Sequence, residues 1–217
     1  MLIALLFAFT ACKDGAGAPD TDTVGLYVSG TSLIIKSGTP VYEAPNNGTV
    51  AEASPYSGAA KTLEFEVSYI LSASSTLPTN GILGTVTITL PSNSDLELAS
   101  DKFNWVPGDA IEAEADVRIG TLAVRSSGGT GYLNLCTAET VFQDGDLVEG
   151  EGYAIMYSTG DVTIQLPRTE IEPGMYAEAD MHLKEGWNFI AASASVDTET
   201  FVSKNIPSTA RWVWRNH

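Results

Sequence analysis

The sequence has few of the residues that most metal and catalytic sites need. Its 217 residues include only two cysteines, Cys12 and Cys136, and two histidines, His182 and His217. Zinc sites draw their ligands mainly from Cys and His, and thiol catalysis needs a histidine near the cysteine. The zinc motif HExxH, the nucleophile motif GxSxG and the phosphate loop GxxxxGK[ST] are also missing. We therefore expect no metal, no cofactor and no enzyme activity.

Positive charge is scarce too. The chain carries 11 Lys and Arg against 27 Asp and Glu, which gives a formal net charge of −16 at pH 7. Such a surface repels the phosphate backbone of nucleic acids and anionic lipid headgroups. We expect no nucleic-acid partner and interpret the charge as a source of solubility. The acidic stretch QDGDLVEGEG at 143–152 lacks the spacing of a calcium-binding loop and is interpreted as a solvated turn.

The chain begins with an apolar stretch, MLIALLFAFTA at 1–11, that is too short to span a bilayer as a helix. Its length fits the apolar region of a signal peptide. The next residues, KDGAGAPDTDT at 13–23, are small, polar and acidic, as in a flexible tether. A cleaved secretory signal and an ordinary buried N-terminal strand are two alternatives for this region.

The residues Phe9-Thr10-Ala11-Cys12 resemble the signal of bacterial lipoproteins, in which small residues precede an invariant cysteine. Phe9 stands where that family usually has Leu, and no Lys or Arg precedes the apolar stretch. The resemblance implies a signal peptide at 1–11, lipid attachment at Cys12 and a tether at 12–23. Cys136 then has no disulfide partner. Since Lys13, not Asp, follows Cys12, the resemblance also implies the outer membrane or the cell surface.

Residues 24–217 show the alternation of apolar and polar residues that is typical of half-buried strands. Two segments show it over ten residues each: TLEFEVSYIL at 62–71 and AIEAEADVRI at 110–119. Turn signals separate the strand-like segments, among them Pro107-Gly108 and Pro173-Gly174. We expect an all-β fold, most simply an antiparallel β-sandwich.

Two short patterns occur twice in the same order. GTVTITLP at 84–91 is similar to GDVTIQLP at 160–167, and AEADVRI at 113–119 is similar to AEADMHL at 177–183. Duplication of a strand–loop–strand unit would explain both pairs. Strands with alternating small residues also look alike by chance. The region therefore forms either one sandwich or two related β modules, which would meet near residues 120–131.

The C-terminal part supports a second resemblance. GDVTIQLP, AEADMHLKEGWNFI and STARWVW follow one another between residues 160 and 214. They resemble uncharacterised β-rich envelope lipoproteins, which carry a DVTI strand, a strand with LKxGWN and a terminal strand with Trp. The resemblance implies a location and a fold but no chemistry.

Aromatic residues offer the clearest candidates for ligand contact. Trp105 and Phe103 lie in the loop-like stretch DKFNWVPGD at 101–109. An exposed Trp on a loop suits a sugar ring or a protein partner, whereas a Trp covering the end of the core has a structural role. Cys136 lies in the strand-like run GYLNLC and is expected to be a small buried residue.

These observations together predict a bacterial lipoprotein anchored to a membrane through Cys12. We expect it to act as a non-catalytic binding or adhesion module of the cell envelope, with a glycan or an envelope protein as partner. A structural component of the envelope is the first alternative, and a carbohydrate-active enzyme is the second. Because composition and spacing locate no site, the structure has to decide between them.

Overall fold

The computed structural model describes residues 24–45, 47–129, 131–143, 146–195 and 197–216. The expected signal peptide at 1–11, the tether at 12–23 and Cys12 lie outside these residues.

The fold is all-β, as predicted. Its strands are β1 (Leu26–Ser29), β2 (Ser32–Ile35), β3 (Thr39–Glu43), β4 (Gly48–Thr49), β5 (Ser54–Pro55), β6 (Lys61–Val67), β7 (Ile70–Leu77), β8 (Ile82–Leu83), β9 (Val86–Ile88), β10 (Glu97–Leu98), β11 (Ile111–Ala113), β12 (Arg118–Ser126), β13 (Gly131–Cys136), β14 (Val141–Gln143), β15 (Asp146–Ser158), β16 (Val162–Glu172), β17 (Met175–Leu183), β18 (Gly186–Ala194), β19 (Thr198–Ser203) and β20 (Arg211–Asn216). The short helix α1 (Ala99–Lys102) and the 3-10 turns η1 (Val50–Glu52), η2 (Asn93–Asp95) and η3 (Gly108–Ala110) lie between strands.

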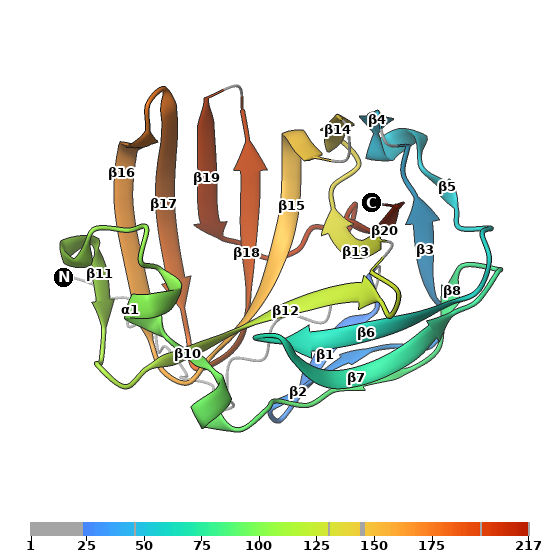
Figure 1. Cartoon of the computed structure of the whole chain (residues 1–217), viewed down its shortest axis with the longest axis horizontal. Helices are drawn as coiled ribbons and strands as arrows, with labels where there is room; N and C mark the ends of the chain where they lie inside the picture. Colours follow the sequence, from blue (N-terminus) through green and yellow to red (C-terminus); the bar gives the residue numbers. More distant parts are fainter. Residues whose placement is uncertain (1–23, 46, 130, 144–145, 196, 217) are drawn as a thin grey trace, which may run out of the picture.

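The sheet branches at its longest strand, β15. One edge of β15 pairs with β18, and the sheet continues through β19, β17 and β16 to β11. The other edge pairs with β14 and β13 and then, from Met156 to Ser158, with β12. One branch runs through β12, β6 and β7, and the other runs through β13, β20, β3 and β5 (Figure 1). The branches leave a wedge between β12 and β13.

The sheet is antiparallel apart from two parallel pairs in the described part of the chain, β17 with β19 and β20 with β3. β19 lies between β17 and β18 and is antiparallel to β18, so it runs parallel to β17. β1, β2 and β9 form a separate small antiparallel sheet.

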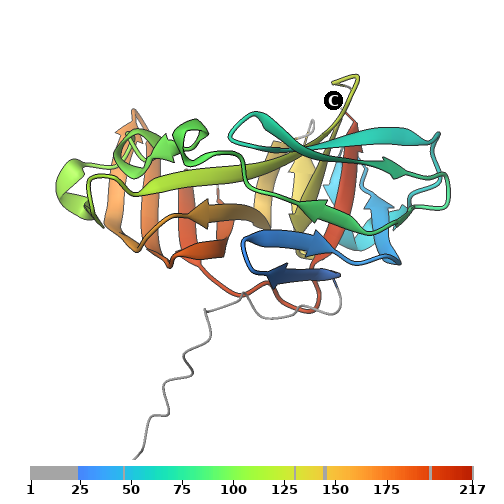
Figure 2. The ribbon, with the colours of Figure 1, turned by 90° about the horizontal axis from the view of Figure 1, so that it is seen from below.

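Both faces of β15 and β18 are covered by apolar clusters, because successive side chains on a strand point to opposite faces. The larger cluster takes Tyr153, Ile155 and Phe189, and a second cluster takes Ile190 together with the strands β16 and β17. A third and smaller cluster surrounds Cys136. Figure 2 shows β12 and α1 on one side of the β16–β19 strands and β1 and β2 on the other side of the molecule.

The expected strand at 62–71 is correct in its first half and wrong in its second. Leu63, Phe65 and Val67 are fully buried on β6, as the alternation predicts. Ser68 and Tyr69 then form a tight turn with φ values of 49° and 67°, and β7 returns beside β6. Alternation alone misses this turn because neither turn residue is Gly or Asn, the usual residues of a two-residue hairpin turn.

The expected single strand at 110–119 is also wrong. β11 ends at Ala113, and β12 begins at Arg118. Between them the chain turns, with Val117 N–H donating to the carbonyl of Glu114 at 3.2 Å, and Ala115 is exposed. The alanines at 113 and 115 bury too little apolar area to hold this segment in the core, so the turn prevails.

The sequence repeat does not produce a structural repeat. The first GxVTIxLP segment forms β9 in the small sheet, whereas the second begins β16 in the large sheet. The first AEAD segment spans the turn before β12, whereas the second lies within β17. β12 runs through residues 118–126 and pairs with β15, β6 and β13, so this part of the expected module boundary lies within the sheet.

Candidate functional site

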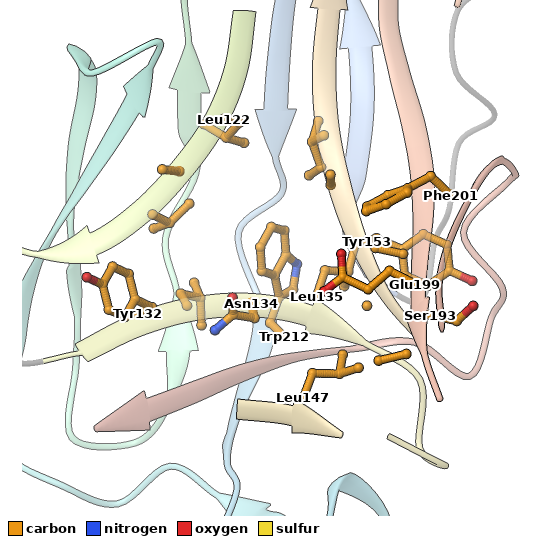
Figure 3. Close-up of a pocket in the computed structure, with 18 residues that line it drawn as sticks. Leu122, Tyr132, Asn134, Leu135, Leu147, Tyr153, Ser193, Glu199, Phe201 and Trp212 are labelled. Atoms are coloured by element: carbon orange, nitrogen blue, oxygen red, sulfur yellow. The ribbon is translucent and has the colours of Figure 1, made fainter. Parts of the chain in front are cut away.

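The wedge between β12 and β13 holds a pocket of about 430 Å³. Its lining comes from β12 in one branch of the sheet, from β13 and β20 in the other, and from β15, β18 and β19 (Figure 3). Phe201 and Ala154 belong to the edge of the second cluster, Leu147 to that of the third, and Leu135 and Trp212 to the first. The pocket therefore lies where the three apolar clusters meet. Its volume falls within the range of small-molecule sites.

Small residues form the floor of the pocket. Gly152 and Ala154 on β15 lie beside Ala192 and Ala194 on β18, and Gly152 pairs directly with Ala192. Larger side chains at these positions would fill the space above the sheet. A Cβ atom at position 152 would already lie 3.3 Å from Leu147 Cδ1. The hollow therefore follows from residue size at neighbouring positions of two paired strands.

Aromatic rings form much of the wall. Phe201, Tyr132 and Trp212 come from β19, β13 and β20, and Figure 3 shows them around the lining. Trp212 is 2% exposed, and its Nε1–H donates to the carbonyl of Val24 at 2.9 Å. Because this bond satisfies the indole N–H, the Trp212 ring contributes apolar surface to the pocket.

The pocket has few polar groups. The Nδ2 atom of Asn134 is shielded from solvent and has no hydrogen-bond acceptor within the described part of the chain. Buried polar groups are nearly always paired, so the unused donor capacity of Asn134 is unusual. The Tyr153 hydroxyl, by contrast, donates to Glu151, which also accepts a bond from Lys204 Nζ at 2.7 Å. Burial, followed by the hydrogen bond to Glu151 and its charge, raises the pKa of Tyr153 and keeps the phenol neutral.

Neither of the two aromatic residues predicted for ligand contact lines the pocket. Phe103 is 3% exposed and belongs to the second apolar cluster. Trp105 is half-buried, with its ring centroid 5.3 Å from that of Phe201 and an interplanar angle of 46°. Trp105 therefore supports Phe201 without lining the pocket itself. Cys136 is 2% exposed in the third cluster, as predicted.

Sequence reasoning missed the pocket residues. The run AASA at 191–194 contains the signal, because small residues there replace the large apolar residues of an ordinary strand. Ala191 faces the first cluster, whereas Ala192 and Ala194 face the pocket. Only the pairing of β18 with β15 brings these alanines next to Gly152 and Ala154.

Other chemistry is sparse in the described residues. No group of three or more His, Cys, Asp and Glu side chains there is placed to hold a metal ion. His182 lies on the outer face of β17 with its Nε2 atom 3.0 Å from Asp180 Oδ1, and both side chains are at least half exposed. The turn between β6 and β7 exposes three apolar side chains, Tyr69 by 82%, Ile70 by 43% and Leu71 by 58%.

None of the helices within the described ranges has the length and apolar character needed to cross a membrane. Comparison of the chain with protein-family models, with curated proteins and with solved structures finds no match. The function therefore has to be argued from the pocket.

Proposed function

We propose that this protein is a lipid-anchored, non-catalytic binding module of a bacterial cell envelope, and that the pocket at the branch of the sheet binds an apolar ligand. The observation that supports this most directly is the pocket itself, about 430 Å³ in volume and lined mainly by apolar and aromatic side chains. Concave apolar sites with a few polar groups are the usual form of small-molecule binding sites.

The lining also argues for binding rather than for packing. Protein interiors pack closely and hold few voids larger than a water molecule. Here the fold keeps the space open with small residues on β15 and β18 while Phe201 is held in place by Trp105. The Asn134 side chain adds a polar group to the lining.

Binding is tested with N-phenyl-1-naphthylamine, an uncharged probe that fluoresces in apolar surroundings. The full chain carrying Cys12→Ala should bind it, and Ala192→Leu should weaken binding at least about tenfold, or about 1.4 kcal/mol, because the leucine fills the pocket. Ala60→Leu, at an exposed position away from the pocket, is the matched control and should bind as the parent does. Near-UV circular dichroism checks that each variant keeps its fold. Equal binding by Ala192→Leu and the parent, or no binding at all, would contradict the proposal.

The anchor is a separate part of the proposal and rests on the lipoprotein-like residues Phe9 to Cys12. Several acyl chains are needed for stable attachment to a membrane, and lipoprotein modification of Cys12 supplies them. In bacterial cells, the parent chain should fractionate with membranes and incorporate labelled palmitate. Cys12→Ala should release the protein to the soluble fraction, while Cys136→Ala should stay with the membranes. Membrane retention of Cys12→Ala would refute the anchor.

A further inference from the structure

The lining of the pocket combines apolar surface with one acidic side chain among the described residues. Among the described residues that line it, Glu199 is the one that carries a charge at neutral pH. Glu199 lies on β19, paired with Ala194 of the pocket floor on one side and with Ala177 on the other. Figure 3 shows its side chain reaching from β19 into the lining, with the carboxylate among the pocket residues. No ion pair or hydrogen bond of the described residues involves this carboxylate.

Cations close to the lining residues are engaged elsewhere: Lys204 pairs with Glu151, and Arg168 pairs with Asp197. Arg125 and Arg215 both pair with Tyr132 of the pocket wall in the sheet register. Arg125 Nη2 donates to Glu66 Oε1 at 2.5 Å, and the Arg215 guanidinium lies 4.3 Å from the ring centroid of Phe142. Neither arginine lines the pocket. A carboxylate or phosphate on a ligand would therefore meet the charge of Glu199 without a cation to compensate it.

The aromatic wall favours the same sign of charge. The faces of Phe, Tyr and Trp rings attract cations, and the attraction grows as water is excluded. The pocket combines the rings of Tyr132, Phe201 and Trp212 with the Glu199 carboxylate. The net charge of −16 further raises the local concentration of cations around the whole molecule.

We propose that the ligand of this pocket is an amphipathic organic cation, with an apolar chain or ring over the alanine floor and an ammonium group beside Glu199. This inference rests on the proposed binding function. It excludes fatty acids and anionic phospholipids as preferred ligands, because their head groups would be repelled by Glu199. The carboxylate of Glu199, an exposed residue at the pocket, pairs with the ammonium, and the ring faces add to the attraction.

The test compares three compounds with the same ten-carbon chain: decylamine, which is protonated at pH 7, decanol and decanoate. Each displaces N-phenyl-1-naphthylamine from the full chain carrying Cys12→Ala, below the concentration at which the compounds form micelles. Decylammonium should bind at least about tenfold more tightly than decanoate, with decanol between them. Glu199→Gln should remove most of this preference and leave decanol unchanged.

Glu178→Gln is the matched control. Glu178 is exposed on the outer face of β17, and it pairs with Thr200, the residue next to Glu199. Its substitution by Gln changes the net charge by the same amount as Glu199→Gln. This variant should keep the preference for decylammonium. If decanol binds but charge has no effect, or if both Gln variants lose the preference equally, the cation inference is wrong while the binding function stands. If neither decanol nor the fluorescent probe binds, the proposed function itself fails.

Discussion

At the scale of single residues, the burial of Cys136 has chemical consequences. The thiol is 2% exposed, and burial raises its pKa from 9.0 to about 12, with a smaller opposing effect from the charge of Arg215. A neutral and inaccessible thiol is a poor nucleophile. Cys136 therefore contributes apolar packing against residues such as Phe142 and Val213.

This burial predicts a pH dependence of stability. Between pH 9 and about 12 the folded chain keeps the thiol proton that the unfolded chain loses, so the free energy of unfolding falls as pH rises through this range. At pH 10 the loss should amount to about 1.4 kcal/mol relative to pH 8. Urea unfolding of the Cys12→Ala chain with and without Cys136→Ala measures it, because the variant without the thiol lacks this contribution. Identical pH dependence in the two proteins would show that the thiol is not protected by burial.

At the scale of elements, the β6–β7 turn stores strain. Ser68 and Tyr69 both have the left-handed backbone conformation, which costs about 1–2 kcal/mol for each residue with a side chain. Contacts with β12 hold the turn in place: Ser68 N–H donates to the carbonyl of Thr121 at 3.1 Å, and Ser68 Oγ donates to that of Ile119 at 3.4 Å. The strain is therefore sustained by tertiary bonds and not by local preference.

Replacing Tyr69 by Gly should raise the free energy of unfolding by about 0.5–1 kcal/mol, because the relief of strain exceeds the entropy cost of glycine. Thermal or urea unfolding measures the change. Leu71→Gly is the control, since Leu71 is also exposed on β7 but does not have a positive φ, and it should lower stability by about 0.5–1 kcal/mol. A loss of stability in Tyr69→Gly similar to that in Leu71→Gly would disprove the strain.

The strands show what a local pattern predicts and what it misses. Alternation correctly assigned the buried face of β6, because this strand has one face in a large apolar cluster. It failed at Ser68-Tyr69, where tertiary contacts favour a turn, and at 114–117, where weak burial favours one. The residue types do not indicate either turn. Periodicity reports which face is buried but not where a strand ends.

At the scale of the whole molecule, the fold class follows from composition and alternation, but the candidate site does not. The pocket depends on the divergence of β12 and β13 from β15, which join residues far apart in the chain. Trp105 was selected for its place in a loop, yet its ring packs against Phe201 and does not line the pocket. The residues that form the floor are alanines and a glycine, which carry no chemical signature in the sequence.

The branched sheet also explains why the pocket stays open. Neither branch covers the space at the branch point, because β12 and β13 pair with different segments of β15 and then diverge. Filling the wedge needs large side chains on the floor, and the chain instead places Ala154, Ala192 and Ala194 there. The binding function proposed here therefore depends on the same topology that joins the three apolar clusters.

The most direct test of the central claim is a crystal structure of the Cys12→Ala chain with N-phenyl-1-naphthylamine at saturating concentration. The account predicts the probe in the wedge, above Ala192 and in contact with Phe201 and Trp212. A probe bound at the exposed tip around Tyr69 and Leu71, or a wedge closed by rearranged side chains, would contradict it.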